Sequence, residues 1–400
     1  MSQKVDFSSM FVPQEEMLEV ATSKKKLRIG IPKEQSDCEH RLALHPDGVE
    51  LLVKNGHQVV IEAGAGMGAR YSDKDFSEAG AEIRTDKKEI YQCPIVLKIE
   101  PPSQAELQLM GRKQILFSSI PLGSDVDWFY KTLKQKQITA FGFEILKGRS
   151  GVYSVVRSMS EIAGSSIIQI AGYYLSSASG GIGKMLGGIT GVPPTEVLIL
   201  GSGTVAEYAT RTALGLGASV KVFDFDIERL RRFQNLFQER VYTSLIKPNA
   251  LEKALQDADV TIGAIKARSK NTPMLISEAM VQNMKRGAVI LDVSIDRGGC
   301  VETSKPTTVN QPTFTKHGVI HYCVPNIGST VARTASYALS NIFTPMLMNL
   351  SESGGMVAYM GTSQHIRDSL YMYNGKCTNK IIAEAYQLPF VNLNVFFPKY

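Results

Sequence analysis

The chain has 400 residues, of which 44% are hydrophobic and 20% are charged, and its formal net charge is +6. This length fits two domains, or one domain inserted in another, and the composition excludes a disordered polyelectrolyte. Acidic residues are interspersed with the basic ones, so the sequence predicts no nucleic-acid-binding surface.

The cysteines are too few and too scattered for a disulfide framework, and none has the close paired spacing of a zinc site. We therefore expect no metal and a reducing, cytoplasmic location. No segment has the roughly eighteen uninterrupted apolar residues of a membrane span, and the first residues lack the layout of a secretory signal. The cysteines are Cys38, Cys93, Cys300, Cys323 and Cys377.

In chain order, polar residues 1–26 come first and are interpreted as an appended arm. Strands and helices then alternate, which predicts a parallel sheet with helices on both faces. The helix expected from Pro46 ends at Gly56, a common helix stop. The strands expected in this part span residues 27–32, 57–66, 93–99 and 114–120.

A glycine-rich segment, residues 180–194, is interpreted as a loop. After it the alternation restarts, and the later strands are expected within residues 259–265, 288–296 and 318–326. Residues 334–350 form a long, mostly apolar helical pattern, which suits an inter-domain spine or an oligomer contact.

The strand expected over residues 196–200 leads into a G-x-G-x-x-A pattern that opens a helix. Gly201 would turn the chain tightly, Gly203 would let the backbone approach a pyrophosphate, and Ala206 would let the helix close on the strand. Thr204 and Val205 complete the turn, and the helix N-terminus offers unpaired N–H groups to phosphates. The pattern predicts dinucleotide binding, against the alternative of an ordinary glycine turn.

Asp224 ends the next expected strand, about twenty residues after the glycines. A carboxylate there accepts hydrogen bonds from both ribose hydroxyls and would repel a 2′-phosphate. The predicted cofactor is therefore NAD rather than NADP.

Many segments in one order resemble the alanine dehydrogenase family, which shares its fold with the NAD-binding subunit of proton-translocating transhydrogenase. The match extends from about Leu27 to Phe390. The matching segments include RIGIPKE, HRLALHPDGV, VVIEAGAG, IVLKIEPP, MSEIAG, GSGTVA, LDVSIDRGGC, PTTVNQPTF, HYCVPNIGSTVARTASYALSN and NGKCTNKIIAEAYQLPF.

This resemblance implies an α/β protein with two Rossmann-like, doubly wound parallel-sheet domains. A substrate domain built from residues 27–154 and 333–400 would hold an inserted NAD-binding domain, residues 155–332, with the active site in the cleft. The implied activity is reversible NAD-dependent oxidative deamination of L-alanine to pyruvate and ammonia. The implied assembly is a homo-oligomer, a hexamer in the family.

Carried over residue by residue, the resemblance places Arg41 and Lys98 on the substrate carboxylate and carbonyl, Asp296 as the catalytic aspartate and Asn326 beside the nicotinamide. The chemistry agrees, because a keto acid needs a cation near its carboxylate. Without the family, Arg41 and Lys98 would be interpreted as exposed cations. Asp296 would be either a turn residue or a strand-end carboxylate with a raised pKa that moves protons. The family also implies NAD contacts at Ser160, Arg229, Ile265, Leu275 and Val293.

One departure concerns the catalytic histidine of the family, because Pro121 stands at that position. A proline side chain cannot donate or accept a proton, and losing a general acid commonly costs about 10²- to 10⁴-fold in rate. His45, near Arg41, is interpreted as a helix-start residue rather than a substitute. Two alternatives therefore stay open: a soluble transhydrogenase-like hydride carrier, and an NAD-binding protein that has lost turnover.

Overall fold

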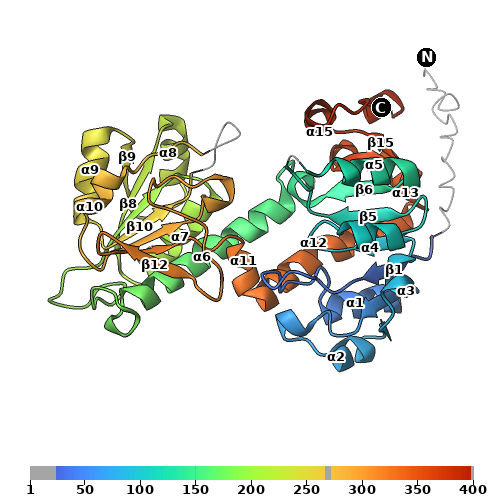
Figure 1. The fold of residues 1–400 in the computed structure, drawn as a ribbon, viewed down its shortest axis with the longest axis horizontal. Helices are drawn as coiled ribbons and strands as arrows, with labels where there is room; N and C mark the ends of the chain where they lie inside the picture. Colours follow the sequence, from blue (N-terminus) through green and yellow to red (C-terminus); the bar gives the residue numbers. More distant parts are fainter. Residues whose placement is uncertain (1–23, 124, 149, 266–271, 398–400) are drawn as a thin grey trace, which may run out of the picture.

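The computed structural model describes residues 24–397 except 124, 149 and 266–271, so the predicted arm lies almost wholly outside the described residues. The chain forms two lobes joined by a long helix, α6 (Ser154–Leu175), and by the segment that contains α11 (Ile327–Thr330) (Figure 1). Within the described part of the chain, no helix combines the length and apolar character that crossing a bilayer requires.

The first lobe is built on a sheet with the strand order β15-β14-β6-β5-β4-β1-β2-β3. Strands β1 to β6 pair in parallel, whereas β14 is antiparallel to both β6 and β15. Because β14 and β15 come from the C-terminal part, both ends of the sequence build this lobe, as expected. The bounds are β1 Arg28–Ile31, β2 Gln58–Glu62, β3 Glu82–Arg84, β4 Ile95–Leu97, β5 Ile115–Ser118, β6 Thr139–Gly142, β14 Leu370–Tyr373 and β15 Lys376–Cys377.

Both faces of this sheet are buried, as alternating side chains show. Phe117 and Phe141 belong to the core that packs against α12 (Ala332–Glu352), while their neighbours Leu116 and Ala140 belong to the opposite core. The remaining helices of this lobe are α1 Pro46–Lys54, α2 Asp73–Glu78, α3 Lys87–Tyr91, α4 Gln104–Leu109, α5 Asp127–Lys136, α13 Met356–Thr362, α14 Gln364–Asp368 and α15 Lys380–Ala385.

The second lobe has a sheet with the order β12-β13-β11-β10-β7-β8-β9, in which only the pairing of β12 with β13 is antiparallel. Two doubly wound sheets are therefore present, as predicted. The bounds are β7 Glu196–Leu200, β8 Ser219–Asp224, β9 Tyr242–Leu245, β10 Val260–Gly263, β11 Val289–Asp292, β12 Thr313–Lys316 and β13 Val319–Tyr322, with helices α7 Thr204–Gly215, α8 Ile227–Gln234, α9 Pro248–Asp257 and α10 Glu278–Gln282.

Short 3₁₀ helices lie between these elements, and two of them carry residues of the site described below. They are η1 Met67–Ala69, η2 Phe143–Ile145, η3 Ser177–Ser179, η4 Ile295–Arg297 and η5 Leu393–Val395. The glycine-rich segment, residues 180–194, is mostly irregular, as predicted, and Lys184 ties it to buried Asp259 by an ion pair of 2.8 Å.

Helix α6 carries the chain from the first lobe to the second and crosses α7 closely. A Cβ atom at Gly164 would lie 2.4 Å from the carbonyl oxygen of Val205, so only glycine permits this approach. The crossing brings the middle of α6 next to the first turn of α7, which follows the glycine turn. The same helix packs against α12, which joins the first lobe from the C-terminal side.

Candidate active site

A cavity of about 530 Å³ lies between the lobes, at the carboxyl ends of strands from both sheets. Ile99 and Ser119 follow β4 and β5 in the first lobe, and Val293 and Val324 follow β11 and β13 in the second. The start of α6 forms one wall through Met159 and Ser160, among other residues. Ligand sites of doubly wound sheets collect at this edge, because the strands end there in loops that can diverge.

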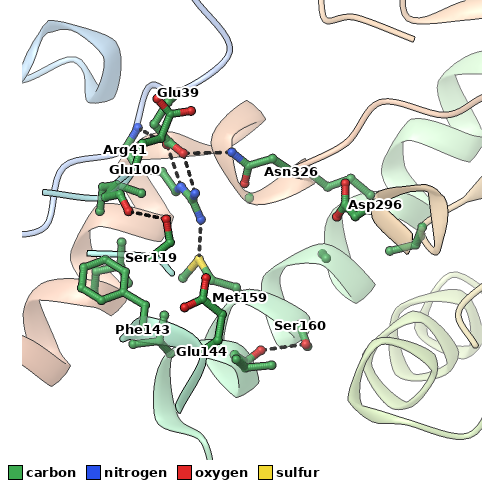
Figure 2. Close-up of a pocket in the computed structure, with 18 of the residues that line it drawn as sticks. Glu39, Arg41, Glu100, Ser119, Phe143, Glu144, Met159, Ser160, Asp296 and Asn326 are labelled. Atoms are coloured by element: carbon green, nitrogen blue, oxygen red, sulfur yellow. Dashed lines mark hydrogen bonds and ion pairs between the residues drawn. The ribbon is translucent and has the colours of Figure 1, made fainter. Parts of the chain in front are cut away.

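Arg41 lines the cavity from the loop before α1, and its guanidinium is held on two sides (Figure 2). Nε and Nη2 donate to the two carboxylate oxygens of Glu39, at 2.7 and 2.5 Å, and Nη1 contacts the sulfur of Met159 at 3.3 Å. The Arg41 side chain is 13% exposed. The predicted carboxylate-binding arginine is therefore placed at the cavity with a fixed orientation.

Asn326 reaches the same carboxylate from the second lobe. It stands before α11 in the left-handed region, at φ 57°, which asparagine tolerates better than most residues. Its Nδ2 donates to Glu39 at 2.9 Å. Burial alone would raise the pKa of Glu39, but the hydrogen bonds and charge of Arg41, with the amide of Asn326, bring that pKa below its ordinary value.

Asp296, the predicted catalytic aspartate, lies on η4 and lines the cavity opposite the first lobe. Its side chain opens into the cleft, yet partial burial raises its pKa, while a hydrogen bond from the backbone N–H of Asn326 opposes that rise. A carboxylate whose pKa is raised is a stronger base than an ordinary aspartate, and its protonated form can return the proton. The position suits acid–base work.

Lys98 was expected to contact the substrate, but it does not line the cavity. It is 2% exposed, and its ammonium pairs with Glu34, whose pKa burial raises to about 7 against the opposing charge of Lys98. Successive residues of an extended chain point to opposite sides, and its neighbour Ile99 lines the cavity. Buried Glu34 needs a cationic partner, so Lys98 has a structural partner instead of a free ammonium.

Glu100 and Glu144 also line the cavity, although neither is among the site residues predicted from the sequence. Each follows a strand of the first sheet, β4 and β6 respectively, which was the available signal. Burial raises the pKa of both carboxyl groups. Glu144 accepts a hydrogen bond from the backbone N–H of Ile120 at 3.0 Å.

The lining residues of the cavity include no histidine. Pro121 does not line the cavity, and its carbonyl accepts a hydrogen bond from the hydroxyl of Tyr130 at 2.8 Å. His45 caps α1 by accepting from the backbone N–H of Asp47 at 3.1 Å, as interpreted from the sequence. Apart from Arg41, the titratable side chains that line the cavity are therefore carboxyl groups.

The glycine turn before α7 has the geometry of a phosphate-binding turn. Gly201 has φ 105°, and a Cβ atom there would lie 2.4 Å from the carbonyl oxygen of Ala264, whereas a Cβ at Gly203 would meet nothing within 4 Å. Gly203 caps α7 without any side-chain hydrogen bond, so the first N–H groups of the helix are open to a ligand. Ala206 is fully buried.

Asp224 is the last residue of β8 and is 3% exposed. One carboxylate oxygen accepts from the backbone N–H and the hydroxyl of Ser202, at 2.9 and 2.7 Å, and the other accepts from the N–H of Asp226 at 3.1 Å. The carboxylate thus supports the glycine turn itself. Arg229, on α8, does not line the cavity, and its Nε lies 4.0 Å from Oδ2 of Asp226.

The other expected cofactor residues separate into two groups. Ser160, Val205 and Val293 line the cavity together with Asp296 and Asn326. By contrast, two apolar residues, Ile265 and Leu275, pack in or against the core on the other face of the second sheet and do not line it.

Comparisons with known proteins cover most of the chain. The family description "Alanine dehydrogenase/PNT, N-terminal domain" matches residues 30–163, and "Alanine dehydrogenase/PNT, C-terminal domain" matches residues 167–380. An alanine dehydrogenase of Halomonas elongata is 38% identical over 366 residues, which cover 91% of this chain and 98% of the relative. That of Methanococcus maripaludis is 38% identical over 364 residues, covering 90% and 97%.

Solved structures agree with this assignment. An L-alanine dehydrogenase superposes with a TM-score of 0.84 at 35% identity, covering 90% of this chain and 99% of that one. A transhydrogenase from Sinorhizobium meliloti superposes with a TM-score of 0.75 at 21% identity, covering 88% and 99%, and this likeness concerns the fold alone.

Proposed function

The chain belongs to the alanine dehydrogenase/PNT family, and on that premise we propose that it catalyses the reversible NAD-dependent oxidative deamination of L-alanine to pyruvate and ammonia. The observation that carries this proposal is one shared cavity. Arg41 from the first lobe, Asp296 from the second and Val205 from the glycine turn all line it.

The residues of the second lobe fit a dinucleotide. The open space at Gly203 and the uncapped start of α7 would accept the pyrophosphate, and Asp224 would accept the ribose hydroxyls in place of its contacts with Ser202. Ser160 and Asn326 would then flank the nicotinamide end in the cavity. The cofactor, when bound, supplies the hydride acceptor.

The residues of the cavity fit an amino acid. Arg41 would bind the substrate carboxylate with the N–H groups that Glu39 leaves free. After the substrate Cα has lost its hydride, Asp296 can take the proton of the attacking water and return it to the departing ammonia. This role uses its raised pKa and replaces the proton transfer that a histidine would perform.

Pro121 and the absence of histidine from the cavity lining keep a second candidate open, an NAD-binding protein without amino-acid turnover or a transhydrogenase-like hydride carrier. Against it, Arg41 keeps an ordered guanidinium at the cavity, and an idle site gains nothing from ordering one.

The five cysteines are all free thiols, which fits the cytoplasm. A homo-oligomer stays a prediction.

The test is an absorbance assay at 340 nm with purified protein, NAD and L-alanine at alkaline pH, alongside calorimetric titration with NAD. We expect NADH to form with L-alanine and NAD to bind. Binding of NAD without NADH formation across a panel of small neutral amino acids would reject the dehydrogenase and leave the second candidate. Omission of the amino acid is the control.

A further inference from the structure

Glu39 occupies a position between the lobes that no motif of the sequence points to. Its carboxylate accepts from the backbone N–H of Arg41 at 3.0 Å, from Nε and Nη2 of the same residue, and from Nδ2 of Asn326. The side chain is 1% exposed. A buried carboxylate with this many donors is fixed in one orientation.

The hydrogen bonds of Glu39 decide which part of Arg41 stays available. A guanidinium has five N–H donors, and here Nε–H and one N–H of Nη2 are used by Glu39. One N–H of Nη1 donates to the sulfur of Met159. Two N–H groups, one on each terminal nitrogen, are left, and this pair can bind a second carboxylate in a bidentate manner.

The charges point the same way. Hydrogen bonds keep the pKa of Glu39 low despite burial, so the carboxylate stays ionised wherever Arg41 is charged. The Glu39–Arg41 pair is then neutral overall, and a substrate carboxylate is bound by fixed donors rather than by an excess of positive charge. We therefore expect the orientation of these donors, in addition to their charge, to determine the affinity for the substrate.

We propose that Glu39 is a positioning residue that orients the Arg41 guanidinium toward the substrate carboxylate. Through its contact with Glu39, Asn326 makes this orientation depend on the placement of the second lobe. The inference rests on the proposed function, because it assumes that Arg41 binds a substrate carboxylate. It adds a physical connection between the lobe that would hold the nucleotide and the group that would hold the amino acid.

The test compares Glu39→Gln with Glu50→Gln, a matched change at a half-exposed pair with Lys54 on α1. Glutamine keeps the volume but cannot accept from both Nε and Nη2, so we expect the KM for L-alanine to rise about 10- to 100-fold. We expect kcat to fall less than KM rises, NAD affinity to stay within about threefold, and Glu39→Asp to restore part of the KM. Glu50→Gln should leave all of these values unchanged.

The connection to the second lobe is tested by a double-mutant cycle with Asn326→Ala. If the two residues act through one contact, adding Asn326→Ala to Glu39→Gln changes the KM less than it does alone. Additive effects would overturn the dependence on the second lobe. A merely structural role would be shown if Glu39→Gln and Glu39→Asp lost kcat, NAD affinity and thermal midpoint equally. If Glu39→Gln does not fold, Glu39→Asp is used for the comparison.

A crystallographic readout separates this inference from the proposed function. In Glu39→Gln, or in Glu39→Asp if that variant alone folds, we expect the Arg41 guanidinium to leave its position, whether or not L-alanine is a substrate. An unmoved guanidinium would overturn the positioning role while the proposed function stands. Absence of turnover in the unaltered protein together with a displaced guanidinium would reject the function and keep the positioning.

Discussion

The side-chain nitrogen of Asn326 lies 2.9 Å from a carboxylate oxygen of Glu39, although 287 residues separate them in the sequence. Asn326 follows the last strands of the second sheet, and Glu39 lies between the first strand and the first helix of the chain. Both residues line the cavity, so this part of its wall is built from both lobes.

Asp296→Asn keeps the shape of the side chain but removes its ability to gain or lose a proton. We expect kcat to fall about 10²- to 10⁴-fold with NAD affinity within a few-fold. Because burial raises the pKa of Asp296, the rate of alanine oxidation in the unaltered protein should rise with pH as the carboxyl group loses its proton. Steady-state kinetics across pH in both proteins checks this, and an unchanged acid limb in the variant would contradict it.

Gly203→Ala should affect NAD binding, whereas Gly201→Ala should affect thermal stability. A methyl group at Gly203 enters open space at an ordinary φ of −87°, so the variant should fold normally and bind NAD more weakly. A methyl at Gly201 would meet the backbone of Ala264 at a φ of 105°, so that variant should lose thermal stability. Calorimetric NAD titration and thermal denaturation distinguish the two, and unaltered NAD affinity in Gly203→Ala would refute the phosphate turn.

Asp224→Ala should lower NAD affinity about tenfold and relax the preference for NAD over NADP, because the carboxylate that repels a 2′-phosphate is gone. Asp224 also supports the turn through Ser202. Ser202→Ala is therefore the control, since it removes one hydrogen bond of the turn but keeps the charge. Dissociation constants for NAD and NADP measure this preference in both variants. If the preference for NAD over NADP changed equally in Asp224→Ala and Ser202→Ala, Asp224 would only support the turn.

Asp259→Asn tests the ion pairs that hold the glycine-rich segment. Asp259 is fully buried and accepts from Lys184 and Lys285, and these hydrogen bonds lower its pKa although burial opposes them. Replacement should lower the free energy of unfolding by about 2 kcal/mol at neutral pH, more than the exposed change Asp257→Asn.

The pH dependence of that effect follows from the lowered pKa. The stabilisation is present above the unfolded pKa of about 3.9 and is lost as pH falls through the lower pKa of the folded state. Urea unfolding of Asp259→Asn and of the unaltered protein should therefore differ most at neutral pH and converge in acid. A difference that grows on acidification would contradict the ion-pair role.

The local pattern of the chain was enough for the fold and the glycine turn. Strand and helix periods, the stop at Gly56 and the turn from Gly201 to Ala206 predicted elements that the structure contains, because these features depend on neighbours in sequence. The antiparallel addition of β14 and β15 to the first sheet was not predicted, since pairing between distant strands leaves no local signal. The family resemblance predicted only that both ends of the chain build one domain.

What the sequence by itself determined is therefore the two doubly wound sheets, the glycine turn before α7 and the presence of Arg41, Asp296 and Asn326 as candidates. Only the tertiary structure decided which charges are free. Burial beside Glu34 takes the Lys98 ammonium away from the cavity, while Glu39 and Asn326 meet across the lobes and orient Arg41. Pairing of buried charges depends on three-dimensional proximity, which residue types and spacing do not encode.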